Sequence, residues 1–186
     1  MDGKASPPEA RRLTRDGGFK QHLAWSPDGK KFLFTRIHQG KMGLWTMNPD
    51  GSGLARLLTQ DVPHFDGHWS PDSKRIVFVF DRLQGTDGKL QINVVDADGS
   101  NHRNLIPHKA FEESPRWSPD GKHVAWVSTR DGNQEIYVTD LEGKEVKRLT
   151  SEVAPDNNPS WSPDGKRLAF VSNRDGGEDV YVMEVK

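Results

Sequence analysis

The chain has 186 residues, and its 26 Lys and Arg residues against 27 Asp and Glu residues give a formal net charge of −1. Because this balance provides no net positive electrostatic field, we predict that the chain neither binds nucleic acid nor inserts into a membrane. The absence of cysteine excludes disulfides, thiol catalysis and cysteine-ligated metals. No stretch approaches the ~18 apolar residues of a membrane-spanning helix, and the first ten residues, MDGKASPPEA, lack the apolar core of a signal peptide.

One six-residue motif recurs four times. WSPDGK stands at residues 25–30, 117–122 and 161–166, and WSPDSK stands at residues 69–74. The tryptophans are therefore 44, 48 and 44 residues apart, and 50 residues separate the last from the first when the count wraps through the chain ends. A period of about 40–50 residues is typical of the blades of a β-propeller.

Each repeat predicts short strands separated by turns that contain Gly and Pro. The strands are rich in apolar, β-branched and aromatic residues, as a pleated and partly buried surface requires. Turns of the Pro-Asp-Gly type suit these positions because Pro presets φ and Gly adopts φ > 0 without steric cost. In chain order the predicted strands are 32–35, 43–48, 55–59, 76–80, 92–97, 102–106, 114–118, 124–128, 135–140, 146–150, 168–172 and 179–184.

The fourth repeat lacks a fourth strand. Residues 10–14, ARRLT, share the letters RLT with residues 148–150, and we predict that they complete the last blade and remove its open edge. The predicted fold is all-β, a propeller of four four-stranded blades in a single domain, residues 1–186, with blade units at about 19–63, 64–109, 110–154, and 155–186 plus 1–18. The alternative is two chains that form an eight-bladed ring, since the same strand could complete a neighbour's blade.

The unit WSPDGKHVAWVSTRDGNQEIYVTDLEGKEVKRLT, residues 117–150, resembles the repeat of TolB-type propellers, which are similar to WD repeats. The resemblance extends over nearly the whole chain. It implies a bacterial propeller that binds other proteins in the periplasm or outside the cell. Similar repeats also form the propeller halves of prolyl-oligopeptidase-like peptidases. TolB itself has six blades after an α/β domain, whereas this chain has four repeats.

Several residues recur in every repeat, and we predict structural roles for them. The tryptophans are expected to start the inner strands and to pack between blades. The turn aspartates are expected to hydrogen-bond nearby amides, because no D-x-D-x-D-G run indicates calcium. The arginines after the second strands are expected in solvated, acid-paired turns. These sets are Trp25, Trp69, Trp117 and Trp161; Asp28, Asp72, Asp120 and Asp164; and Arg36, Arg82, Arg130 and Arg174.

The repeats differ most in the loops that enter the first strand and in those between the second and third strands. Propeller geometry places both kinds of loop on one face, and loops on a rigid scaffold commonly carry binding. Histidines on such a face could respond to pH near neutrality. We predict a partner-binding face formed by His22, His38, His64, Phe65, Asp66, Glu112, Glu113, Asn157 and Asn158.

The predicted function is a non-enzymatic scaffold that binds a protein or peptide. The chain contains no G-x-S-x-G, H-E-x-x-H or P-loop pattern, and we predict no catalytic residue, metal or cofactor. One alternative is a structural, oligomeric or engineered propeller without a ligand, in which a homodimer is possible. A propeller hydrolase or lyase is the other alternative.

Overall fold

The computed structural model describes residues 9–82 and 90–185. Within these residues the chain forms strands only, so none of them belongs to a helix that could cross a membrane. The strands build four antiparallel sheets, called blades one to four below, with the orders β1-β2-β3-β4, β5-β6-β7-β8, β9-β10-β11-β12 and β13-β14-β15. The prediction of an all-β fold with four sheets is thus confirmed.

The strand bounds follow the repeat. They are β1 (Lys20–Trp25), β2 (Phe32–His38), β3 (Lys41–Met47), β4 (Ala55–Arg56), β5 (His64–Trp69), β6 (Arg75–Asp81), β7 (Leu90–Asp96), β8 (Arg103–Asn104), β9 (Glu112–Trp117), β10 (His123–Ser128), β11 (Glu135–Asp140), β12 (Lys147–Arg148), β13 (Asp156–Trp161), β14 (Arg167–Ser172) and β15 (Asp179–Glu184).

Two features of the strands differ from the sequence prediction. The fourth strand of a blade pairs through only two residues, as in β12, where the prediction extended over residues 146–150. The repeated tryptophan ends the inner strand and does not start it, as Trp117 does in β9. The reason is that the Ser-Pro-Asp-Gly turn follows at once, and its proline has no N–H group for a β-ladder.

The recurring turn is held by its own side chains. In blade three, the Ser118 hydroxyl donates to Asp120 Oδ1 at 2.6 Å, and the Lys122 amide donates to the same oxygen at 3.0 Å. The His123 amide donates to Ser118 Oγ at 2.9 Å. Gly121 sits at φ 69°, a left-handed conformation that glycine adopts at little cost. Ser118, Asp120 and Gly121 therefore each have a local role in closing the turn between the inner strand and the second strand.

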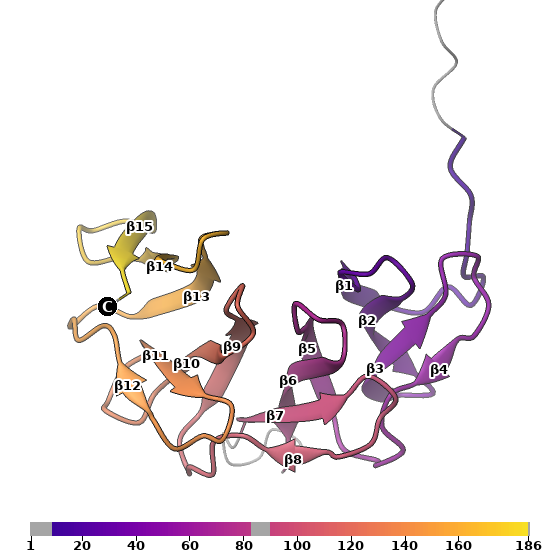
Figure 1. Ribbon diagram of the computed structural model, residues 1–186, viewed down its shortest axis with the longest axis horizontal. Helices are drawn as coiled ribbons and strands as arrows, with labels where there is room; N and C mark the ends of the chain where they lie inside the picture. Colours follow the sequence, from indigo (N-terminus) through magenta and orange to yellow (C-terminus); the bar gives the residue numbers. More distant parts are fainter. Residues whose placement is uncertain (1–8, 83–89, 186) are drawn as a thin grey trace, which may run out of the picture.

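The four blades follow one another along an arc (Figure 1). The inner strands β1, β5, β9 and β13 lie on the concave side, and the outer strands β4, β8 and β12 lie towards the convex side. Successive blades pack face to face through apolar side chains. Between blades two and three, for example, Val77 and Val79 belong to the same buried cluster as Trp117 and Trp126.

The aromatic residues of the second strands are buried: three of them lie at these joints, and Phe34 lies in the cluster on blade one. Phe34, Phe78, Trp126 and Phe170 are at most 4% exposed. The motif tryptophans differ among themselves: Trp69 and Trp117 are 8% exposed, whereas Trp25, at the free end of blade one, is 56% exposed. At two of the three joints the indole N–H also crosses to the preceding blade: Trp117 Nε1 donates to the His68 carbonyl and Trp161 Nε1 to the Arg116 carbonyl, each at 3.2 Å, whereas Trp69 Nε1 has no hydrogen-bond partner among the described residues.

Residues 10–14 do not lie where the sequence predicts. The last sheet has three strands among the described residues, and none of them comes from the N-terminal segment. Leu13 instead packs on blade one against Phe32, Phe34 and Met47, at the opposite end of the arc from β15 (Figure 1). The side chain of Leu13 is thus partly buried on blade one, without closure of a ring within the same chain.

Candidate functional site

Each inner strand carries a bulge at the same place. The pairing register shifts between Gln21 and Ala24 in β1 and at the corresponding points of β5, β9 and β13. One residue in each bulge has a positive φ of 48–52°, and none of the four is glycine: His22, Asp66, Ser114 and Asn158. Positive φ is uncommon in such residues, and bulges re-aim side chains near functional sites. The repetition in all four blades makes the bulge a built feature of this fold.

The four bulge residues line one pocket. It has a volume of about 370 Å³. Most of its lining residues belong to the inner strands, which lie on the concave side of the arc (Figure 1). Phe65 and Val79 provide its apolar part, and Glu113 and Arg116 add charge. Each of the four blades contributes one bulge residue to this pocket, although these residues lie far apart in the sequence.

Opposite charges meet at the wall of this pocket. Asp66 is 9% exposed, and its two carboxylate oxygens each accept a hydrogen bond of 3.4 Å from Arg116 Nη1. His68 Nε2 lies 3.2 Å from Asp66 Oδ1. Burial opposes ionisation of Asp66, but the hydrogen bond from His68 and the charge of Arg116 outweigh it and lower the pKa of this carboxyl. Asp66 is therefore a fixed negative charge in the wall.

Glu113 behaves in the opposite way. Burial raises its pKa, the nearby negative charge of Asp66 raises it further, and a hydrogen bond of 2.6 Å from Gln134 Nε2 opposes the rise. The pocket thus contains the ionised carboxylate of Asp66, the carboxyl of Glu113, which binds a proton more readily, and the guanidinium of Arg116. Such a wall offers both donors and acceptors to a polar ligand.

The pocket does not assemble an activated nucleophile from the described residues. His22 Nδ1 lies 3.2 Å from the hydroxyl of Thr35, a fully buried residue outside the pocket lining. Ser114, the pocket's own hydroxyl, is not hydrogen-bonded to a histidine there. Catalysis by a serine needs a base within hydrogen-bond reach, and no described histidine provides one to Ser114. Residues 9–82 and 90–185 also contain no group of three or more His, Asp or Glu side chains placed to hold a metal ion.

Comparison with known proteins agrees with this architecture. A family model described as the TolB beta propeller domain matches residues 86–186. The chain belongs to the TolB beta-propeller family. The Tol-Pal system protein TolB of Gluconobacter oxydans is 38% identical over 64 residues, which are 34% of this chain and 14% of that protein.

Solved structures extend the likeness of this TolB-type propeller to most of the chain. A putative TolB from Agrobacterium tumefaciens superposes with a TM-score of 0.78 at 26% identity, over 91% of this chain and 64% of that one. A puromycin-hydrolyzing peptidase of Mycobacterium tuberculosis gives a TM-score of 0.75 at 16% identity, over 90% of this chain and 30% of that one, which shows a shared fold alone. The chain spans less than a third of the length of the curated relatives it matches.

The structure brings five of the nine predicted binding residues of this TolB-type propeller together. His22, Phe65, Asp66, Glu113 and Asn158 all line the 370 Å³ pocket. Asn157 is next to it, and its Oδ1 accepts a hydrogen bond of 3.0 Å from Asn158 Nδ2. His38 lies at the exposed end of β2, where its ring packs edge-on against Trp45.

The remaining two predicted residues lie inside the protein. His64 and Glu112 are completely buried at the start of their inner strands. His64 Nδ1 donates to the Val62 carbonyl at 2.7 Å, and burial lowers the pKa of its imidazole to about 4. The sequence could not separate these buried residues from the pocket residues, because they are adjacent: His64 precedes Phe65 and Asp66, and Glu112 precedes Glu113.

Sequence reasoning missed Ser114, Arg116 and Val79 as pocket residues. Ser114 corresponds by register to His22, Asp66 and Asn158, so an alignment of the repeats at this position would have found it. Arg116 directly precedes Trp117 of the motif, and no pattern in the sequence marks it as a binding residue.

The repeated arginines do not form a ring of charge. Arg130 Nη2 lies 2.8 Å from the buried Glu112, and Arg174 Nη2 lies 2.8 Å from the buried Asp156. Arg36 is offset by two positions, since it pairs with Lys20 in β1, and it is 4% exposed with Asp16 as its ionic partner. The acid-paired character was predicted, but the partners of Arg130 and Arg174 are buried acids of the inner strands, and the partner of Arg36 is the exposed Asp16 of the N-terminal segment.

Proposed function

We propose that this TolB-type propeller is a non-enzymatic scaffold that binds a segment of another protein in the concave pocket. The observation that carries the proposal is the repeated bulge, which turns one non-glycine side chain from each of four blades into a single pocket. Extended peptides present many donors and acceptors, and a wall that contains Asp66, Glu113 and Arg116 can satisfy groups of either sign. From the resemblance to TolB we expect the periplasm or the cell exterior as its compartment.

The proposal is tested with a phage-displayed library of random peptides selected on the immobilised protein. The site variant carries Asp66→Asn, Glu113→Gln and Asn158→Gly. Asn and Gly both tolerate the positive φ at positions 66 and 158, so the backbone is left unstrained. We expect the Kd of selected peptides to rise about tenfold or more in this variant, because two charged or chargeable contacts are lost.

The control is the variant Glu142→Ala with Glu145→Ala, which removes two acidic side chains from exposed positions in the turn after β11 and just before β12. It should bind the selected peptides as the unchanged protein does. Equal binding by the site variant and the control would refute the pocket assignment. Failure to enrich any peptide would favour the alternative, a structural propeller without a ligand.

A further inference from the structure

The three joints within the chain share one design. The trailing face of a blade consists of alternate side chains of its second and third strands, which in blade two are Val77, Val79, Ile92 and Val94. It packs on the leading face of the next blade, which in blade three contains Trp117, Val124 and Trp126. All of these side chains are at most 8% exposed. Burial of such apolar area is the dominant favourable term in packing the blades together.

The same two faces are open at the ends of the arc. Val180 and Val182 occupy the positions in β15 that Ile92 and Val94 occupy in β7, and they are 78% and 65% exposed. At the other end, Trp25 on the leading face of blade one is 56% exposed. Beside it, Leu13, Leu23, Phe32, Phe34 and Met47 help to line a largely apolar hollow of about 250 Å³. Each end therefore presents half of a joint.

The N-terminal segment already lies where the outer strand of a preceding blade would lie. Leu13 packs on blade one as Leu149, from the outer strand of blade three, packs against blade four. Arg12 Nε donates to the Thr14 carbonyl at 2.8 Å, and Arg148 Nε donates to the Thr150 carbonyl at 2.6 Å.

A second contact places the segment in the same way. Arg11 Nη2 donates to the Pro49 carbonyl at 3.1 Å. Arg103 of β8 donates to the carbonyl of Leu141 in the next blade, and by strand register Leu141 is the counterpart of Pro49. Residues 10–14 thus reproduce contacts that outer strands elsewhere in the chain make with the blade that follows.

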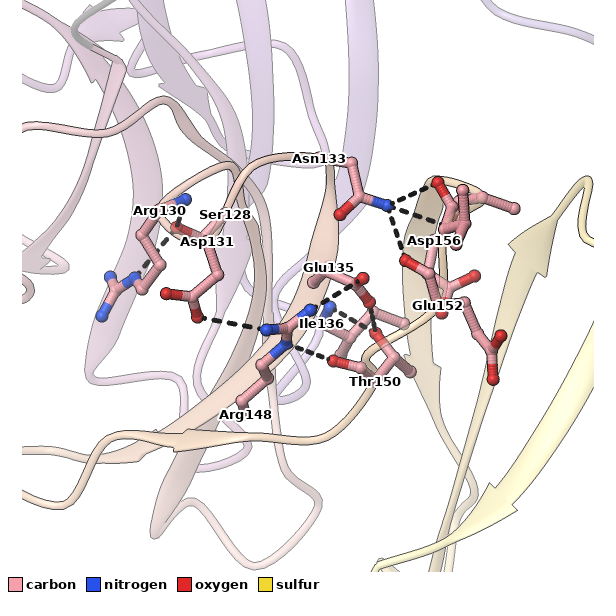
Figure 2. Close-up of polar contacts among 12 residues, drawn as sticks. Ser128, Arg130, Asp131, Asn133, Glu135, Ile136, Arg148, Thr150, Glu152 and Asp156 are labelled. Carbon is pink, nitrogen blue, oxygen red and sulfur yellow. Dashed lines mark hydrogen bonds and ion pairs between the residues drawn. The ribbon is translucent and has the colours of Figure 1, made fainter.

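Blade four, to which such an outer strand would belong, has no outer strand among the described residues. In blade three the buried carboxylate of Glu135 accepts a hydrogen bond of 3.0 Å from Arg148 Nη2 and another from the Thr150 hydroxyl at 2.5 Å (Figure 2). Asp179 holds the same register position in β15, opposite Ser172 as Glu135 is opposite Ser128, and it is exposed. Arg12 and Thr14 at one end of the arc, and Asp179 at the other, are the two halves of this cluster.

We propose that a second copy of this chain docks end to end, so that β15 of one copy pairs with residues 10–14 of the other. Val180 and Val182 then cover the hollow on blade one, and the guanidinium of Arg12 meets the carboxylate of Asp179. Trp25 Nε1 donates to the Ser160 carbonyl across the contact, as Trp161 Nε1 donates to the Arg116 carbonyl within the chain. Two such contacts close a ring, and one contact repeated in the same sense forms an open chain of copies.

The first measurement is the mass in solution by light scattering over a range of protein concentrations. End-to-end docking predicts a mass that rises above 20.9 kDa with concentration, to twice that value for a ring and beyond it for an open chain. A mass of one chain at every concentration up to the millimolar range would overturn the proposal. A ring that closes within one copy would give this single-chain mass.

Charge reversal then identifies the contact. In Arg12→Glu the contact brings two carboxylates together, and in Asp179→Arg it brings two guanidinium groups together. Like charges placed face to face weaken association strongly, so each variant alone should show a dissociation constant raised about tenfold or more. Both positions are exposed, so the thermal stability of the isolated chain should remain unchanged.

Mixing the two variants is the decisive step. Every contact between an Arg12→Glu chain and an Asp179→Arg chain joins opposite charges, so an equimolar mixture should recover the mass of the unchanged protein. In the control pair, Arg12→Glu mixed with Glu142→Arg, one of the two possible contacts between the unlike chains keeps the native Arg12–Asp179 pair and the other still brings two carboxylates together, so the mixture should recover the mass only in part. Two charge-reversed variants that associate like the unchanged protein, or a mixture that stays dissociated, would overturn the assignment of this surface.

Discussion

The guanidinium of Arg130 lies 2.8 Å from the carboxylate of Glu112, a side chain with no exposed surface. The same carboxylate accepts hydrogen bonds from the indole N–H of Trp126 and from the Ser128 hydroxyl. Arg130 in turn lies over the ring of Tyr137, with its Cζ 4.8 Å from the ring centroid. One buried acid thus joins the inner strand, the second strand and the following loop of blade three.

We predict that Arg130→Met lowers the free energy of unfolding by about 3–5 kcal/mol at pH 7, since it leaves a buried charge without its partner. The double variant Glu112→Gln with Arg130→Met should recover part of this loss, because a neutral amide costs less to bury. Denaturant unfolding of the two variants and of the unchanged protein provides the comparison. A loss below about 1 kcal/mol in Arg130→Met would contradict this account.

The loss in Arg130→Met should also depend on pH. Burial raises the pKa of Glu112, and Arg130 is the main group that lowers it. Without Arg130, the folded state binds a proton at Glu112 more readily than the unfolded chain does. The deficit relative to the unchanged protein should therefore shrink as the pH falls from 7 towards the ordinary carboxyl pKa of about 4.5. A deficit that is equal at pH 7 and pH 5 would exclude this coupling.

The repeated motif was enough to predict the blades, because WSPDGK fixes a turn through contacts within six residues. Ser118, Asp120 and Gly121 close that turn through contacts among residues 118–123. The placement of residues 10–14 was not predictable in the same way. The sequence ARRLT resembles that of an outer strand, but this resemblance does not determine which blade the strand contacts. In the structure, Leu13 contacts blade one, which follows it in the chain.

His64 should make the protein sensitive to mild acid. Burial lowers the pKa of its imidazole from 6.5 to about 4 in the folded state, and its Nε2 has no hydrogen-bond partner among the described residues. The unfolded chain therefore takes up a proton first as the pH falls below 6.5. This single group should cost up to about 3 kcal/mol of stability between pH 6.5 and pH 4, and nothing above that window.

The variant His64→Asn isolates this effect. The amide N–H₂ of Asn replaces the imidazole Nδ1–H that donates to the Val62 carbonyl, but it does not titrate. We expect a flatter dependence of unfolding free energy on pH between 6.5 and 4 in this variant, measured by urea titration at each pH. His123→Asn, at the half-buried first position of β10, is the control. Equal slopes for the unchanged protein and His64→Asn would show that His64 is not the group responsible.

The site was predictable in part for a related reason. The repeats differ at the loop that enters each inner strand, and that difference led to His22, Asp66, Glu113 and Asn158. Within that loop, however, the strand alternates, so Glu112 points into the protein while Glu113 lines the pocket. The bulge decides which neighbour points where, and a bulge is a property of backbone pairing that one sequence does not display.

Two glycines with nearly the same backbone test how closely the blades approach. Gly29 has φ 71° and Gly143 has φ 70°. A Cβ at position 29 would meet nothing within 4 Å, whereas a Cβ at position 143 would lie 2.0 Å from the carbonyl oxygen of Leu105 in the preceding blade. Replacement by alanine imposes the same positive-φ strain at both positions, of about 1–2 kcal/mol.

The difference between the two variants therefore reports the joint alone. We expect Gly143→Ala to lose about 1–3 kcal/mol more than Gly29→Ala, since the β11–β12 turn and the outer strand of blade two must separate. Thermal and denaturant unfolding of the pair provide the measurement. Similar losses in both variants would mean that the turn yields without disturbing the neighbouring blade, and the close packing of blades two and three would then contribute little to stability.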